Sequence, residues 1–213
     1  MRGYGDPCGI ARTLGLVGER WALLVVRELV FGPKRFSDLR RGLAGISENV
    51  LSQRLRELER AELVRRRRFA PSSLSAYELT ERGRELEPVL TAMSRWGADV
   101  PLAEGTNPEL GIDALIFTLH TTFDAGLAEG LDVVAHLRLG DDHFRVRVRD
   151  GRFSARRTEP DDADVIITTT APTLQALVFA DRTFEKAEGS GEITISGDRA
   201  AAEHLLRCLP PPR

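Results

Sequence analysis

The chain has 213 residues, enough for two domains of about 100 residues each, and its 42% hydrophobic and 29% charged residues are ordinary for a globular protein. Its two cysteines form no CxxC motif, which argues against a metal cluster or a disulfide framework. The first residues lack an apolar signal core and no apolar run approaches membrane-spanning length. We therefore expect a cytoplasmic protein without a membrane partner.

The net charge of -2 hides an asymmetry between the two halves of the chain. Residues 1–100 contain 18 Lys and Arg against 13 Asp and Glu, a net charge of +5. Residues 101–213 contain 12 basic and 19 acidic residues, a net charge of -7. This division predicts that only the first half meets a polyanion such as nucleic acid.

The first half predicts a run of helices. Apolar spacing favours two helices within residues 9–31 and a short helix at 36–43. The next helix begins after Ser47, whose hydroxyl suits an N-cap. Its buried face is marked by Leu51, Leu55 and Leu58.

A β-hairpin and a last helix follow. Strands are expected at 63–70 and 75–79 around a turn at 71–73, and Thr80 caps a helix over 81–97. Four helices, a hairpin and a helix form the order of a winged helix-turn-helix, a mainly α domain in which the hairpin is the wing.

The pattern changes after a Pro- and Gly-rich stretch at 98–111, which reads as a linker. Expected next, in order, are a helix at 112–123, strands at 131–139, 143–149, 152–157 and 164–169, helices at 171–180 and 182–187, a strand at 192–196 and a helix at 198–208. The fold class is α+β, with a mainly antiparallel second sheet. The domains are expected at 1–99 and 112–213, with the linker at 100–111 between them.

The second helix of a helix-turn-helix lies in the major groove of DNA. If its leucines face the core, Asn49, Ser52, Gln53 and Arg56 face outward. Asn and Gln can pair with adenine and Arg with guanine, so these residues suit direct base readout. A solvated helix face is the alternative.

Basic residues around this helix predict contacts to the DNA backbone. Arginines 65–68 begin the wing, and because successive side chains of a strand point to opposite faces, the four cannot share one role. A charged edge that blocks aggregation is the alternative. The full predicted DNA-contacting set is Lys34, Arg35, Arg40, Ser47, Asn49, Ser52, Gln53, Arg56, Arg65, Arg66, Arg67 and Arg68. Arg54 points partly inward and is expected to pair with Glu57 or Glu59.

The first 100 residues resemble the HxlR family of winged-helix regulators. The resemblance is carried by Cys8 and by ARTLGLVGERW, LLVVRELVFGPKRFSDLRRGLAGIS, NVLSQRLRELERAELVRRR and YELTERGREL. It implies a repressor and a homodimer that binds double-stranded DNA, with dimer contacts from the N-terminal helix and the helix at 81–97. Glu62 departs from the family, which usually has Gly there.

Residues 112–208 resemble the sterol-carrier-protein-2 fold through VRVRDGRFSARR and ADVIITTTAPTLQALVFADRTFEKAEGSGEITISGDRAAAEHLLRCL. The resemblance implies an apolar tunnel for a hydrophobic effector. Its expected lining is Leu115, Leu119, Phe123, Val133, Leu137, Phe144, Val146, Leu174, Val178 and Phe184. A plain packed core has the same periodicity and is the alternative.

Two further hypotheses concern the input signal and the activity. The resemblance to the HxlR family implies a redox role for Cys8, because some relatives sense oxidants or electrophiles through the cysteine at this position; a small buried apolar residue at a dimer contact is the alternative. A lipid carrier whose first domain only dimerises is a rival to the regulator. The four histidines match no catalytic spacing, and no phosphate loop or metal motif is present, so we expect neither an enzyme nor a cofactor.

Overall fold

The computed structural model describes residues 4–68, 75–159, 162–180 and 182–211. The chain forms two compact units, Met1–Ala92 and Met93–Arg213. The division falls inside a helix, before the linker that the composition predicts. Within the described ranges, every helix is too short or too polar to span a bilayer.

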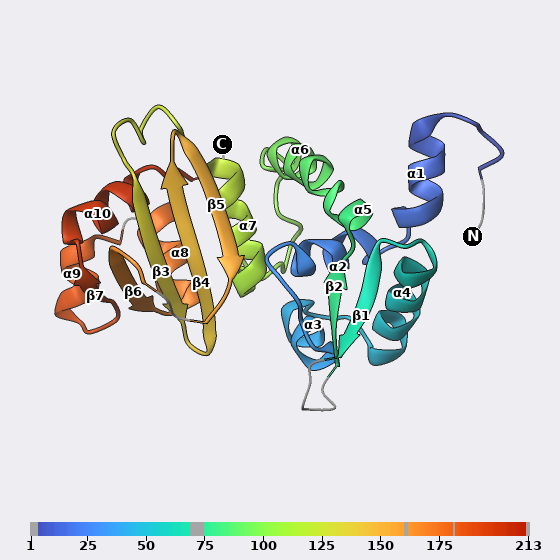
Figure 1. The fold of residues 1–213 in the computed structure, drawn as a ribbon, viewed down its shortest axis with the longest axis horizontal. Coiled ribbons are helices and arrows are strands. Elements are labelled where there is room, and N and C mark those ends of the chain that lie inside the picture. Colours follow the sequence, from blue (N-terminus) through green and yellow to red (C-terminus); the bar gives the residue numbers. More distant parts are fainter. Residues whose placement is uncertain (1–3, 69–74, 160–161, 181, 212–213) are drawn as a thin grey trace. The chain divides into compact units, whose positions relative to one another are not determined.

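The N-terminal unit has the predicted order of helices and hairpin (Figure 1). Its elements are α1 (Gly9–Val17), α2 (Ala22–Leu29), α3 (Phe36–Gly42), α4 (Glu48–Arg60), β1 (Val64–Arg68), β2 (Ser75–Leu79), α5 (Glu81–Arg84) and the first part of α6 (Glu87–Gly97), whose residues from Met93 on belong to the C-terminal unit. The two strands pair antiparallel and form the wing, residues 64–79. The predicted turn at 71–73 lies outside the described residues.

Helix α4 lies in the predicted register. Leu51, Leu55 and Leu58 are all buried, as are Val25 and Val26 of α2. Burying one leucine side chain contributes about 2 kcal/mol, so this stripe fixes which side of α4 faces out. The chain turns sharply after the helix, where Glu62 has a φ of 56°, in the left-handed region that glycine favours.

A buried ion pair ties α2 to the segment before α3. The Glu28 carboxylate is 1% exposed and accepts a hydrogen bond of 2.6 Å from Lys34 Nζ. Gly42 leaves room for it, because a Cβ there would lie 2.1 Å from Glu28 Oε2. The backbone of Lys34 also pairs with that of Tyr77 through bonds of 3.0 and 2.8 Å. The wing, α2 and α3 are therefore joined around one small polar cluster.

The single helix expected at 81–97 is instead two helices, α5 and α6. Pro88 gives the physical reason, because it has no N–H to donate to Arg84 and its ring crowds that carbonyl. Thr80 does cap α5 as predicted, with its Oγ1 accepting from the Gly83 N–H at 3.0 Å.

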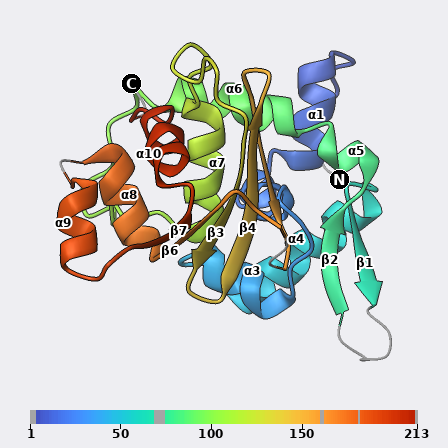
Figure 2. The ribbon, with the colours of Figure 1, turned by 60° about the vertical axis from the view of Figure 1, so that its left-hand side comes forward.

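The C-terminal unit is a five-stranded sheet with helices packed against it (Figure 2). Its elements are α7 (Ile112–Thr122), β3 (Val133–Leu139), β4 (Asp142–Arg149), β5 (Arg152–Arg157), β6 (Val165–Thr169), α8 (Ala171–Phe179), α9 (Phe184–Gly189), β7 (Thr194–Gly197) and α10 (Arg199–Arg207). The strand order is β5-β4-β3-β6-β7, and only the β3–β6 pair is parallel. The α+β class and the mainly antiparallel sheet are thus confirmed.

Candidate nucleic-acid interface

The outward side of α4 is polar. Asn49, Gln53 and Arg56 are exposed and Ser52 is half-buried, while the leucines occupy the opposite side. Spacings of four and three residues place Asn49, Gln53 and Arg56 on one stripe of the helix. Asn49 and Arg56 make no side-chain hydrogen bond or ion pair to other described residues, so their polar groups are available to a ligand.

Other polar groups of α4 already have partners. Ser47 is the predicted N-cap, and its Oγ accepts from the Val50 N–H at 3.3 Å. Gln53 donates through Nε2 to Glu57 Oε1 at 3.0 Å. Arg54 is buried and pairs with the same Glu57 carboxylate at 2.7 Å, one of the two partners expected for it.

The basic residues before α4 divide into three cases. The prediction that Lys34 contacts DNA is wrong. Lys34 is buried against Glu28, so its ammonium group cannot reach a phosphate. Arg35 is exposed beside the start of α3. Arg40 is also exposed but pairs with Glu48 of α4. Arg35 is thus the most available of the three.

The wing arginines alternate between two faces, as expected for a strand. Arg65 and Arg67 both contact Glu78, through bonds of 2.7 and 3.3 Å to its carboxylate. Burial alone would raise the pKa of Glu78, but hydrogen bonds and charge from these two arginines outweigh it and lower the pKa below 4.5. This carboxylate therefore holds the two arginines in place.

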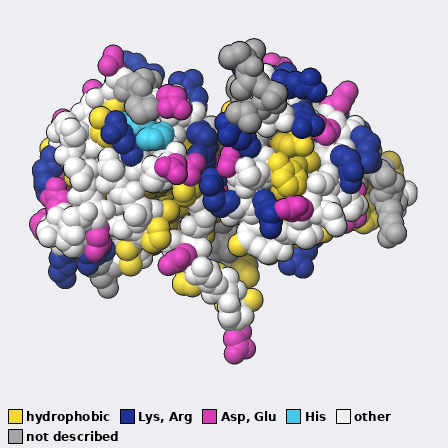
Figure 3. Space-filling model, turned by 90° about the horizontal axis from the view of Figure 1, so that it is seen from below, with side chains coloured by type: hydrophobic (Ala, Val, Ile, Leu, Met, Phe, Trp, Pro, Cys, Tyr) yellow, Lys and Arg dark blue, Asp and Glu magenta, His cyan; other side chains and the backbone are white. Residues whose placement is uncertain are grey.

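Arg66 and Arg68 point to the other face of the wing. The Arg66 guanidinium donates to Ser75 Oγ at 2.9 and 3.0 Å and lies 5.9 Å from the centre of the Tyr77 ring. Arg68 is exposed and makes no ion pair with the described residues. Figure 3 looks onto the end of the unit that carries α3 and the wing, and basic side chains are spread over it with acidic ones between them.

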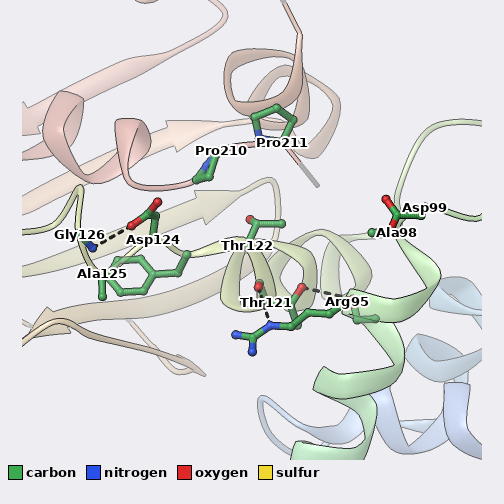
Figure 4. A pocket seen from close by; sticks show the side chains of 12 residues that line it. Arg95, Ala98, Asp99, Thr121, Thr122, Asp124, Ala125, Gly126, Pro210 and Pro211 are labelled. Atoms are coloured by element: carbon green, nitrogen blue, oxygen red, sulfur yellow. Dashed lines mark hydrogen bonds between the residues drawn. The ribbon is translucent and has the colours of Figure 1, made fainter. Parts of the chain in front are cut away.

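The ten residues expected to line a ligand tunnel lie in different environments. Phe123 lines an open hollow of about 570 Å³ in the C-terminal unit (Figure 4). Val178 and Phe184 line another of about 420 Å³. The other seven side chains are buried in the core of the unit.

The hollow in Figure 4 has a polar wall as well as an apolar one. Arg95 donates through Nε to the Thr121 carbonyl at 3.3 Å, and the Ser94 and Thr121 hydroxyls lie 3.2 Å apart. Asp124 accepts from the Gly126 N–H at 2.8 Å. This lining differs from the apolar one that the sequence predicted.

The two cysteines lie in contrasting environments. Cys8 is exposed and caps α1, with its Sγ accepting from the Ala11 N–H at 3.3 Å. Cys208 is buried, and its thiol donates to the carbonyls of Leu127 and His204 at 3.2 and 3.1 Å. Burial raises the pKa of the Cys208 thiol, which makes that thiol less reactive.

Comparison with known proteins assigns different relatives to the two parts of the chain. The model of the HxlR-like helix-turn-helix matches residues 16–103, and that of the alkyl sulfatase C-terminal domain matches residues 108–213. The latter part is also similar in structure to the stereoselective inverting sec-alkylsulfatase Pisa1 from Pseudomonas sp., at 22% identity over 49% of this chain and 16% of that one, with a TM-score of 0.41.

Two curated proteins are similar to the N-terminal part. The uncharacterized HTH-type transcriptional regulator Rv3095 of Mycobacterium tuberculosis is 42% identical over 98 residues, 45% of this chain and 61% of its own length. The match therefore spans less than two thirds of that relative. The uncharacterized HTH-type transcriptional regulator YkvN of Bacillus subtilis is 39% identical over 103 residues, which make up 46% of this chain and 86% of its own. With this coverage and with the winged helix-turn-helix in place, the chain belongs to the HxlR-like helix-turn-helix family.

Proposed function

We propose that the protein is a homodimeric transcription regulator, a repressor, that binds double-stranded DNA through α4 and the wing. One observation carries the proposal: the leucine stripe of α4 is buried while Asn49, Gln53 and Arg56 are exposed together on its opposite side. A helix-turn-helix places this kind of stripe in the major groove. We place the protein in the cytoplasm and assign it no catalytic role.

In this proposal the residues divide into base readers and backbone contacts. Asn49 and Gln53 suit the adenine edge, and Arg56 suits guanine, since an amide and a guanidinium can each form two hydrogen bonds there. Arg35, Arg66 and Arg68 are exposed or only lightly held, so they suit phosphates. Arg65 and Arg67 contribute charge while Glu78 restrains them.

The decisive experiment measures base preference. After a binding site is selected in vitro with the full chain, Arg56→Ala should lose about 1–3 kcal/mol of preference at one base position. Arg66→Ala should weaken binding to all sequences and lower the slope of log K against log salt by about 1. Fluorescence anisotropy on selected and scrambled duplexes gives both quantities.

Arg60→Ala is the matched control, because Arg60 is exposed at the far end of the same helix and the change in charge is identical. It should leave base preference unchanged. If Arg56→Ala binds the selected and scrambled sites as the wild type does, α4 is not the reading helix and the proposal fails.

The proposed regulator has an effector, a hydrophobic small molecule that binds to the C-terminal domain. Its support is the resemblance to the sterol-carrier-protein-2 fold and the hollow beside Val178 and Phe184, where Leu177, Leu206 and Leu209 add apolar wall. A ligand that binds one dimer geometry more tightly would shift the spacing of the two reading helices, and half-site spacing must match the groove.

A thiol switch at Cys8 is a second candidate input. The exposed sulfur at the N-terminus of α1 favours it, because an oxidant in solution can reach this thiol. Cys8→Ser should then abolish the loss of DNA binding caused by diamide, whereas Cys208→Ser, at the buried thiol, should respond as the wild type does. An unaltered diamide response in Cys8→Ser rejects this input.

A further inference from the structure

One face of the C-terminal sheet has an unusual composition. Helices α7, α8 and α10 all lie on the opposite face (Figures 1 and 2), toward which Phe144, Val146 and Val148 of β4 point. Because side chains alternate along a strand, the residues between them point to the other face, which we call the outer face. Its arginines are Arg138, Arg145, Arg147, Arg149, Arg152 and Arg156.

The charge on the outer face has a single sign. None of the outward strand positions in the described residues holds Asp or Glu; the others carry Val, Ile, His, Ser or Thr. Six of the twelve basic residues after position 100 therefore gather on one face, in a part of the chain with a net charge of -7. The net charge of the domain and the charge of this face are opposite in sign.

Fold stability does not account for this arrangement. Arg145 lies directly opposite Arg156, and Arg149 directly opposite Arg152. Like charges in such cross-strand positions repel each other and destabilise a sheet. An ordinary solvated sheet face, which mixes both signs, avoids that penalty.

Arginines elsewhere in the same unit have carboxylate partners. Arg157, on the helix-covered face, is bound by Asp113 and Asp142, and Arg199 by Glu188 and Glu203. On the outer face, Arg149 reaches Asp132 at 3.3 Å. The outer-face arginines that make no ion pair with other described residues are Arg138, Arg147, Arg152 and Arg156. The last three of these are exposed, so their guanidinium groups are open to an anion in solution.

We infer that the outer face is a second DNA-binding surface, which holds the phosphate backbone of the duplex whose bases α4 reads; this inference rests on the proposed function. Guanidinium forks bind phosphate oxygens in pairs. The face has no outward Phe, Tyr or Trp among the described strand positions, so it lacks the stacking groups that single strands need. The apolar side chains at its described outward positions are Val134 and Ile166, too few to enter a bilayer, which leaves duplex DNA as the best match.

A tethered second contact would strengthen binding without adding sequence preference. Once α4 is seated, the outer face is held near the same duplex at a high effective concentration. Phosphate contacts carry no base information, so their contribution shows only in affinity and in its dependence on salt.

The test compares two triple variants of the full chain on a random-sequence duplex. Arg147→Gln, Arg152→Gln and Arg156→Gln together remove three outer-face charges. The matched control changes Arg182, Arg199 and Arg207 to Gln, which alters the net charge equally at other places on the same unit.

The slope of log K against log salt should fall by about 2.7 in the outer-face variant, since each phosphate contact contributes about 0.9, and should stay as in the wild type in the control. Circular dichroism melting checks that both variants are folded, and Arg152→Gln alone should give about a third of the change.

Each outcome decides between specific claims. Equal slopes for the two triple variants overturn the outer-face contact. If this happens while Arg56→Ala still loses base preference, the proposed function stands and only this inference fails. A slope difference without any base preference in the wild type overturns the proposed function instead. If the outer-face variant loses binding to phosphatidylglycerol vesicles but keeps its DNA slope, the face binds lipid and the assignment to DNA is wrong.

Discussion

At the scale of single residues, charged side chains of the N-terminal unit act in pairs that the sequence shows only in part. The alternation of arginines 65–68 could be predicted, because a strand has a period of two. Their partner Glu78 could not, because the register of the hairpin depends on a turn whose length and type the sequence leaves open. Likewise, Lys34 reads as a surface residue until Glu28 is placed beside it.

Glu78 gives the wing a predicted dependence on pH. Its pKa in the folded protein is lowered, so its stabilising effect is present above the unfolded value near 4.5 and is lost as the pH falls through the lowered value. Glu78→Gln should therefore lower the free energy of unfolding by about 1 kcal/mol at neutral pH, a modest figure because both arginines are largely exposed. The difference from the wild type should shrink below pH 4.5.

Urea unfolding at a series of pH values measures this difference directly. Arg68→Gln is the control, since Arg68 makes no ion pair with the described residues and its replacement should leave stability unchanged at every pH. A deficit in Glu78→Gln that stays constant down to pH 3 would show that the carboxylate charge is not the cause.

At the scale of elements, local sequence patterns predicted a helix correctly where its capping residue and its apolar periodicity agreed. Ser47 and three leucines fixed the start and the buried side of α4. Proline is tolerated in the first turn of a helix and breaks its interior, so Pro88 suits a helix that starts at Glu87, but the sequence analysis missed the break between α5 and α6. Apolar positions at 86, 90 and 93 continue the helical period across the break and conceal it.

No local pattern revealed the order of the strands, and none could decide between a ligand tunnel and a packed core. The strands β3 to β5 follow each other as hairpins, but placing β6 beside β3 joins residues about 30 positions apart in the chain. Apolar side chains such as Leu115 and Phe144 have the same spacing whether they line a cavity or pack a core, and the structure buries both. Only the three-dimensional arrangement could distinguish these cases.

At the scale of the whole molecule, charge sums do not show where on the surface the charges lie. The division into a basic first half and an acidic second half predicted that only the first half meets a polyanion. Net charge, however, says nothing about where the charges lie. Antiparallel pairing of β4 (DHFRVRVR) with β5 (RFSARR) gathers their arginines on a single face of the sheet. The alternation of arginine with apolar residues is visible in the sequence, but the order of the strands in the sheet decides which arginines become neighbours.

The proposed homodimer leads to a prediction about exposed apolar residues. Ile10 of α1 is 75% exposed and Trp96 of α6 is 79% exposed, values at which a lone monomer leaves large apolar surfaces in water. Ile10→Glu combined with Trp96→Glu should convert the dimer to monomers, because two charges would have to be buried in the interface. Native mass spectrometry of protein from its own host measures the mass and reveals any hydrophobic ligand retained.

Leu127→Glu serves as the control, since Leu127 is exposed in the C-terminal unit and lies on neither helix. It should leave the dimer intact. A wild-type chain that is monomeric at micromolar concentration, or a double variant that stays dimeric, would rule out α1 and α6 as the interface.

The carboxylate of Glu57 has a consequence for how the protein rejects wrong DNA. It accepts a hydrogen bond from the Gln53 amide, which would have to give up this bond to read a base under the proposed function. We expect a site that offers an adenine edge to replace this hydrogen bond, whereas a site without one leaves the Gln53 amide unsatisfied while Glu57 keeps its contact with Arg54. If Gln53 reads a base as proposed, discrimination comes from a penalty on mismatched sequences as much as from attraction to the matching one.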